Sequence, residues 1–153
     1  MNLAGTIYGT VIATALVAGL TEDDSLGEWE IIAWLLATMG AFWIAHAYAT
    51  LLAGLSFDGR LPTWRQARGA LAHEWAIVQA AVPATLALLL GAFHVVSEQT
   101  AEELAIGAGL VALAGWGWTL ARRDRLSWGR AAAVALGSAA LGAVVIAVKL
   151  AVE

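Results

Sequence analysis

The chain has 153 residues, of which 61% are hydrophobic and only 13% are charged, and this balance excludes an ordinary soluble domain, in which about 25% of residues carry charge. The formal net charge is -4 and no basic run is present, which argues against nucleic acid binding. The absence of cysteine excludes disulfides, thiolate metal sites and a cysteine nucleophile, so the composition predicts an integral membrane protein without those chemistries.

Five apolar segments are long enough to cross a membrane. A hydrocarbon core about 30 Å thick needs roughly 20 apolar residues in a helix. Segments of about that length cover residues 3–20, 31–55, 75–96, 104–120 and 131–152. They contain almost no charge, whereas the helices of a soluble bundle would show a polar face. We therefore predict an all-α polytopic membrane protein in which residues 1–153 form a single domain of five transmembrane helices.

The first segment, residues 3–20, carries hydroxyl side chains at helical spacing. It lacks the basic region and the cleavage site of a secretory signal, so we expect it to be retained as a helix. Thr6 and Thr10 are four residues apart on one face, and Tyr8 lies on a neighbouring face. Each threonine hydroxyl can bond a carbonyl of the preceding turn. The alternative is that these side chains line a polar pathway.

The second segment, residues 31–55, contains an ionisable side chain near the predicted middle of the membrane. His46 lies in the run WIAHAYATLL, and Tyr48 and Thr50 follow it. Thr50 shares the face of His46 because four residues separate them. An ionisable group inside a membrane helix is expensive unless it faces a cavity or a partner, so His46 is a functional candidate.

Three interpretations of His46 remain open from the sequence. The ring can be neutral and donate to a neighbouring helix, at Tyr8, Gln79 or a carbonyl. It can instead line a polar pathway as a protonatable or ion-contacting group. A tight metal site is the third interpretation, but one histidine without nearby carboxylates or thiolates supplies too few ligands for zinc or iron. We expect no metal and no cofactor.

A basic loop precedes the third segment, and residues 63–71 within it form either a short interfacial helix or a solvated connector. The third segment covers residues 75–96, with Glu74 at its start and Gln79 about a turn and a half deeper. Pro83 interrupts the segment, which membrane helices tolerate when neighbours or water satisfy the freed carbonyl. We expect Glu74 near the mouth of a pathway, where it would attract cations.

Glycines in the first and last segments predict close helix contacts. Gly5 and Gly9 are four residues apart in the first segment, and Gly137 and Gly142 lie in the last. Membrane helices associate through close backbone approach, which such small residues permit. The contacts can form within one chain or across a dimer, and the sequence leaves both open.

The distribution of charge predicts the orientation in the membrane. Cytoplasmic loops carry an excess of lysine and arginine. The loops after the first and third segments are acidic, and the arginines gather in the other two loops, at Arg60, Arg65, Arg68, Arg122, Arg123, Arg125 and Arg130. We therefore expect a cytoplasmic N-terminus and a C-terminus outside.

Two stretches of the chain are similar to a known family. YGTVIATALVAGL, residues 8–20, resembles the first-helix pattern of the vacuolar iron transporter family, and residues 125–145 resemble its closing hairpin. The resemblance implies a five-helix scaffold and a dimer with a passage between the first helices. The positions that match the metal ligands of the family hold Tyr8, Ile44 and Tyr48, and its glutamate-rich cytoplasmic segment is absent. The resemblance therefore implies the scaffold without iron transport.

No sequence motif predicts an enzyme, because the chain has no nucleophile elbow, HExxH motif or phosphate-binding loop. We predict a multi-pass homodimer in a bacterial-type plasma membrane that acts as a channel or transporter-like permeation unit for a small cation or proton. The expected polar lining is Thr6, Tyr8, Thr10, His46, Tyr48, Glu74 and Gln79. The alternative is a membrane scaffold that binds a partner protein or lipid and in which His46 is structural.

Overall fold

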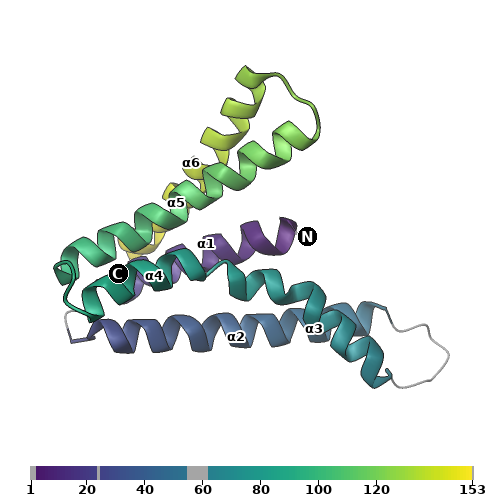
Figure 1. The fold of residues 1–153 in the computed structure, drawn as a ribbon, viewed down its shortest axis with the longest axis horizontal. Helices are drawn as coiled ribbons and strands as arrows, with labels where there is room; N and C mark the ends of the chain where they lie inside the picture. Colours follow the sequence, from purple (N-terminus) through teal and green to yellow (C-terminus); the bar gives the residue numbers. More distant parts are fainter. Residues whose placement is uncertain (1–2, 24, 55–61, 153) are drawn as a thin grey trace.

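The computed structural model describes residues 3–23, 25–54 and 62–152, and the regular elements of this part of the chain are all helices. The helices are α1 (Leu3–Leu20), α2 (Glu28–Ala53), α3 (Trp64–Gln79), α4 (Val82–Ala92), α5 (Glu98–Arg123) and α6 (Trp128–Val152) (Figure 1). The predicted all-α class is thus confirmed.

Several of these helices are apolar enough to suggest a membrane-associated protein. Three of them could cross a membrane by length and composition, namely α2, α5 and residues Trp128–Val148 of α6. The pair α3 and α4 would add a fourth span if it is counted as one broken helix. The apolar part of α1, Ala4–Leu20, is shorter. Five spans therefore remain a prediction.

The third predicted segment, residues 75–96, is divided into two helices that meet at an angle of 49°. Pro83 explains the break, because proline has no backbone N–H and its ring clashes with the carbonyl four residues earlier, which belongs to Gln79. Gln79 is the last residue of α3, and the N–H of Ala81 donates to Val78 over 3.1 Å in a tighter turn. The predicted third segment is thus interrupted at Pro83, and its crossing of the membrane as one span stays a prediction.

The helix α3 also begins earlier than the third predicted segment. Its N-cap is Thr63, whose side chain accepts a hydrogen bond from the N–H of Gln66, while the Gln66 side chain accepts from the N–H of Thr63. This reciprocal capping starts the helix in the basic loop. The predicted interfacial helix of residues 63–71 is therefore the first half of a longer helix.

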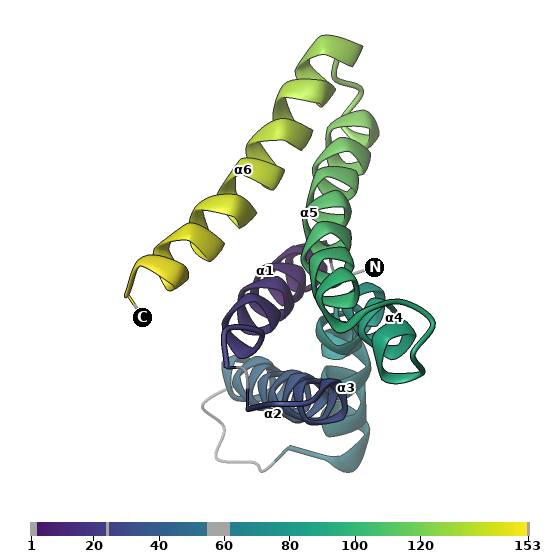
Figure 2. The ribbon, with the colours of Figure 1, turned by 90° about the vertical axis from the view of Figure 1, so that its left-hand side faces the viewer.

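The helix α1 contacts every other helix, and α5 and α6 pack against each other as an antiparallel hairpin (Figure 2). Large side chains seal the core between these elements, with Val17 of α1, Leu35 and Met39 of α2, Ile77 of α3 and Leu88 of α4 fully buried. Many apolar side chains remain on the outside, which suits a surface that faces lipid.

The four predicted packing glycines lie in different surroundings. Gly5 and Gly9 are buried, and a Cβ atom added to Gly9 would lie 2.9 Å from the carbonyl oxygen of Ile77. Gly142 is also buried, against the side chain of Leu113, whereas a Cβ on Gly137 would enter open space. Gly9 and Gly142 therefore permit contacts of α1 with α3 and of α6 with α5, and Gly137 makes no such contact.

Candidate functional site

The side chain of His46 on α2 is half-buried, where α2 packs against α1. Its ring centroid is 5.0 Å from that of Tyr8 on α1. The Nδ1 atom is 3.0 Å from the carbonyl oxygen of Phe42, one turn earlier in α2. Because a carbonyl can only accept, this contact assigns a proton to Nδ1 and leaves Nε2 as the acceptor of the neutral ring. Tyr8 is 43% exposed, so the aromatic pair reaches the surface.

A buried carboxylate of α3 contacts α2 one turn beyond His46, at Thr50. Glu74 of α3 is only 6% exposed, and its Oε1 accepts a hydrogen bond of 2.9 Å from the hydroxyl of Thr50 on α2. A buried carboxylate needs such partners, because the loss of hydration is otherwise uncompensated. Thr50 follows His46 by four residues, so both lie on one face of α2. We call Tyr8, His46, Thr50 and Glu74 the polar track.

Aromatic contacts hold α3 against this part of α2. The indole N–H of Trp43 donates to the carbonyl oxygen of Leu71 over 2.8 Å. The ring of Trp43 also meets that of Trp75 edge-to-face at a centroid distance of 5.1 Å. Trp75 directly follows Glu74 in α3, so these contacts position Glu74 opposite Thr50.

A pocket of about 270 Å³ lies between the end of α2 and the first half of α3. Its walls include Thr50, Leu51 and Gly54 from α2 and the α3 residues Gln66, Gly69 and His73. Thr50 thus belongs both to the pocket and to the polar track. A ligand in the pocket would be separated from the buried carboxylate of Glu74 by one hydroxyl group.

The predicted threonine stripe faces another part of the molecule. Thr6 and Thr10 are buried, and the Thr10 hydroxyl donates to the carbonyl oxygen of Thr6 over 2.7 Å. Thr14 continues the stripe, and its side chain fills the space left by Gly109 of α5. Thr14 therefore packs α1 against α5, whereas the ring of Tyr8 contacts rings of α2.

Two further predicted lining residues lie on the outside of the molecule. Tyr48 is 61% exposed, and Gln79 is also exposed at the end of α3. Of the predicted lining, the structure brings Tyr8 and His46 into contact, and Glu74 is bonded to Thr50 one turn further along α2.

Glu28, at the start of α2, is a buried carboxyl that the sequence analysis did not identify. The side chain is 7% exposed, and its Oε1 is the one buried side-chain polar atom among the described residues that has no hydrogen-bond partner. The oxygen occupies the space left by Gly91 of α4, beside Ala101 of α5. In the sequence, Glu28 is one of several acidic residues around the start of α2, so nothing distinguishes it as a buried residue.

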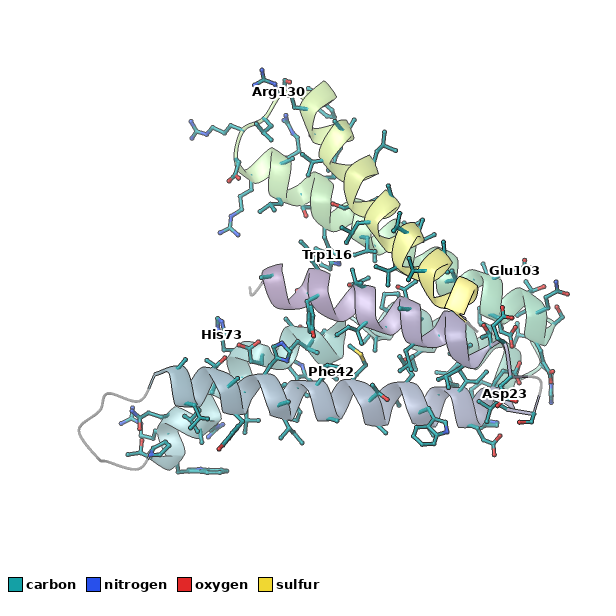
Figure 3. The ribbon with its side chains drawn as sticks, turned by 180° about the vertical axis from the view of Figure 1, so that it is seen from behind. Asp23, Phe42, His73, Glu103, Trp116 and Arg130 are labelled. Atoms are coloured by element: carbon teal, nitrogen blue, oxygen red, sulfur yellow. The ribbon has the colours of Figure 1, made fainter. Side chains whose placement is uncertain are left out.

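Labelled acidic and basic side chains lie toward opposite ends of the molecule. Figure 3 shows Asp23 and Glu103 at one end, and His73 and Arg130 toward the other. The guanidinium of Arg122 stacks over the ring of Trp128 at 4.6 Å near the turn of the α5–α6 hairpin. In the part of the chain that the structure describes, no three His, Asp or Glu side chains are grouped as metal ligands would be.

The polar track is thus a short series of side chains from three helices that can accept or donate hydrogen bonds. Neither a family model, nor a curated protein, nor a solved structure matches this chain.

Proposed function

We propose that this chain is an integral membrane protein that acts as a channel or transporter-like permeation unit for a small cation or proton. The observation that carries the proposal is the buried carboxylate of Glu74, bonded to Thr50 at an open pocket and one helical turn from His46. Ionisable groups are rare inside membrane helices and mark ion or proton pathways when they occur.

In this mechanism His46 is the protonatable gate or relay. The Nδ1–H group donates to the Phe42 carbonyl, so Nε2 is the atom that takes up a proton. Imidazole exchanges protons readily near neutral pH, and the phenol of Tyr8 lies next to it. Glu74 attracts cations from the pocket toward Thr50 and His46. The track begins at the end of α2 and reaches the surface again at Tyr8.

Five spans are the topology that we propose, with the pair α3 and α4 as one broken span and α1 as the shortest. The helix α2 rises about 33 Å between Glu28 and Thr50 at 1.5 Å per residue, close to the hydrocarbon thickness of about 30 Å. Exposed indoles near helix ends, at Trp29, Trp64 and Trp128, fit interfacial anchors. The arginine-rich end would face the cytoplasm of a bacterial-type plasma membrane.

A homodimer with its passage between the first helices is the arrangement implied by the resemblance to the vacuolar iron transporter family. The partly exposed Tyr8 on α1 suits such a passage. Iron is not the proposed substrate, because the matching positions Ile44 and Tyr48 carry no metal-binding carboxylate or thioether.

Flux in lipid vesicles tests the proposal. The full chain is reconstituted, and proton and potassium flux are compared for the original sequence, His46→Ala and the matched control Tyr48→Phe. We expect flux from the original chain and from Tyr48→Phe, and a loss of about tenfold or more in His46→Ala, since a positioned proton-transfer group contributes at least that factor. Flux no higher than that of empty vesicles in all samples would refute the proposal.

The second candidate function is a membrane scaffold that binds a partner protein or lipid. The observation that favours it is the bonding of His46 within its own helix, at the Phe42 carbonyl. In that case His46→Gln leaves the fold and partner capture intact. Substitution of the buried Gly9, which lies against Ile77, would instead disrupt both.

A further inference from the structure

At Thr50, the pocket at the end of α2 presents a hydrogen-bond acceptor to a ligand. The hydroxyl of Thr50 has one O–H bond, which it donates to Oε1 of Glu74. The lone pairs of the hydroxyl oxygen are therefore what remains for a ligand in the pocket. A ligand that meets Thr50 must be a hydrogen-bond donor, and the carboxylate behind Thr50 favours a donor with positive charge.

The helix α2 adds negative potential at the same place. Its C-terminal end, where the carbonyls of the last turn carry partial negative charge, forms one wall of the pocket through Leu51 and Gly54. No basic residue lies in the last turn of α2 to compensate this charge. Arg65 and Arg68 of α3 do not belong to the pocket wall.

The rest of the wall is partly apolar and partly polar. Pro62, Leu51 and Ala70 contribute hydrocarbon surface, and Gln66 and His73 contribute polar side chains. Gly69 has open space around its Cα, so its missing side chain leaves room for a ligand. A ligand that fits this surface has an apolar body attached to a cationic donor.

We propose that this pocket binds a primary alkylammonium ion. The ammonium group lies at Thr50 and the C-terminal end of α2, and the alkyl chain lies against Leu51 and Ala70. Because it names a substrate class for the permeation unit, the inference rests on the proposed function. The binding itself is measured without transport, so the two can fail separately.

Isothermal titration calorimetry on the full chain in detergent micelles tests the proposal with three probes of equal length. n-Butylammonium chloride carries the charge that the pocket favours, 1-butanol is neutral, and sodium butanoate has the opposite charge. We expect n-butylammonium to bind at least tenfold more tightly than either of the others, after subtraction of heats from empty micelles. Equal or tighter binding of butanoate would overturn the assignment.

Two substitutions locate the binding site. Gly69→Leu places a side chain in the pocket, at a position where an added Cβ has no atom within 4 Å. Gly137→Leu is its matched control at an equally open glycine on α6. We expect Gly69→Leu to weaken n-butylammonium binding at least tenfold and Gly137→Leu to leave it unchanged, with the same helix content by circular dichroism. Wild-type affinity in Gly69→Leu would overturn the assignment.

Glu74→Gln tests the electrostatic part, because the amide oxygen can still accept from Thr50 while the charge is lost. A tenfold weakening is expected, and unchanged affinity in the folded variant would contradict a cation site; if this variant does not fold, Gly69→Leu alone decides. Vesicle flux on the same preparations separates the two proposals. Flux without n-butylammonium binding refutes the alkylammonium site and supports the permeation function. Binding without any flux supports the alkylammonium site and refutes the permeation function.

Discussion

Replacement of Thr50 by valine removes one hydroxyl group from the polar track with almost no change in shape. The Glu74 carboxylate then loses the hydrogen bond of 2.9 Å that Thr50 donates, while it remains 6% exposed. A hydrogen bond to a charged group is worth about 1.5–3 kcal/mol when buried. Thr50 itself is exposed, so solvent screens the interaction and we expect a loss of about 1–2 kcal/mol.

Thermal unfolding in detergent measures this loss. For a chain of about 150 residues, a change of 1 kcal/mol shifts the Tm by about 2–4 °C, so Thr50→Val should lower the Tm by about 2–8 °C. A double-mutant cycle with Glu74→Met, which cannot accept the bond, isolates the pair, because the effects of two residues in contact are not additive. Strict additivity of the two substitutions, or an unchanged Tm in Thr50→Val, would refute the account of how Glu74 is held.

Four further substitutions test other parts of the structure. Gly9→Ala should destabilise the fold by about 1–3 kcal/mol, because the added Cβ meets the backbone of α3. Gly137→Ala should stabilise α6 by up to about 1 kcal/mol, because its Cβ enters open space. Equal Tm shifts of the two variants would contradict this contrast. Ser25 donates two hydrogen bonds to Asp23, which lower the pKa of that carboxyl, so Ser25→Ala should raise the pKa of Asp23 measured by carbon NMR. The stability that this pair contributes is present above the ordinary pKa of aspartate and is lost as the pH falls through the lowered pKa of Asp23. Pro83→Ala should straighten the α3–α4 pair, seen as a longer distance between spin labels at its two ends in a chain that has no native cysteine, and an unchanged distance would assign the bend to packing.

Much of the helical structure could be predicted from hydropathy, including both ends of α1, but the starts of α2 and α5 could not. The helix α2 starts at Glu28 and α5 at Glu98, because Gly27 and Ser97 act as N-caps ahead of the apolar runs. Charged residues thus belong to helices that hydropathy alone begins several residues later. Pro83 was recognised in the sequence, but whether a proline kinks a helix or divides it depends on the tertiary contacts around the break.

The candidate site was predictable only in part. Ionisable side chains in apolar runs are visible in a sequence, which is why His46 and Glu74 could be named. The bond between Thr50 and Glu74 joins residues 24 positions apart, and no local pattern shows which helix faces meet. Glu28 was missed for the same reason, since its burial depends on a glycine in α4 and an alanine in α5.

The central claim is that the polar track carries a cation or proton across the membrane. The most direct measurement is proton and potassium flux into vesicles that contain the full chain, with His46→Ala and Tyr48→Phe side by side. The account predicts flux in the original chain and in Tyr48→Phe, and a loss of about tenfold or more in His46→Ala. Equal flux in His46→Ala and the original chain would contradict it, as would flux that does not exceed that of protein-free vesicles.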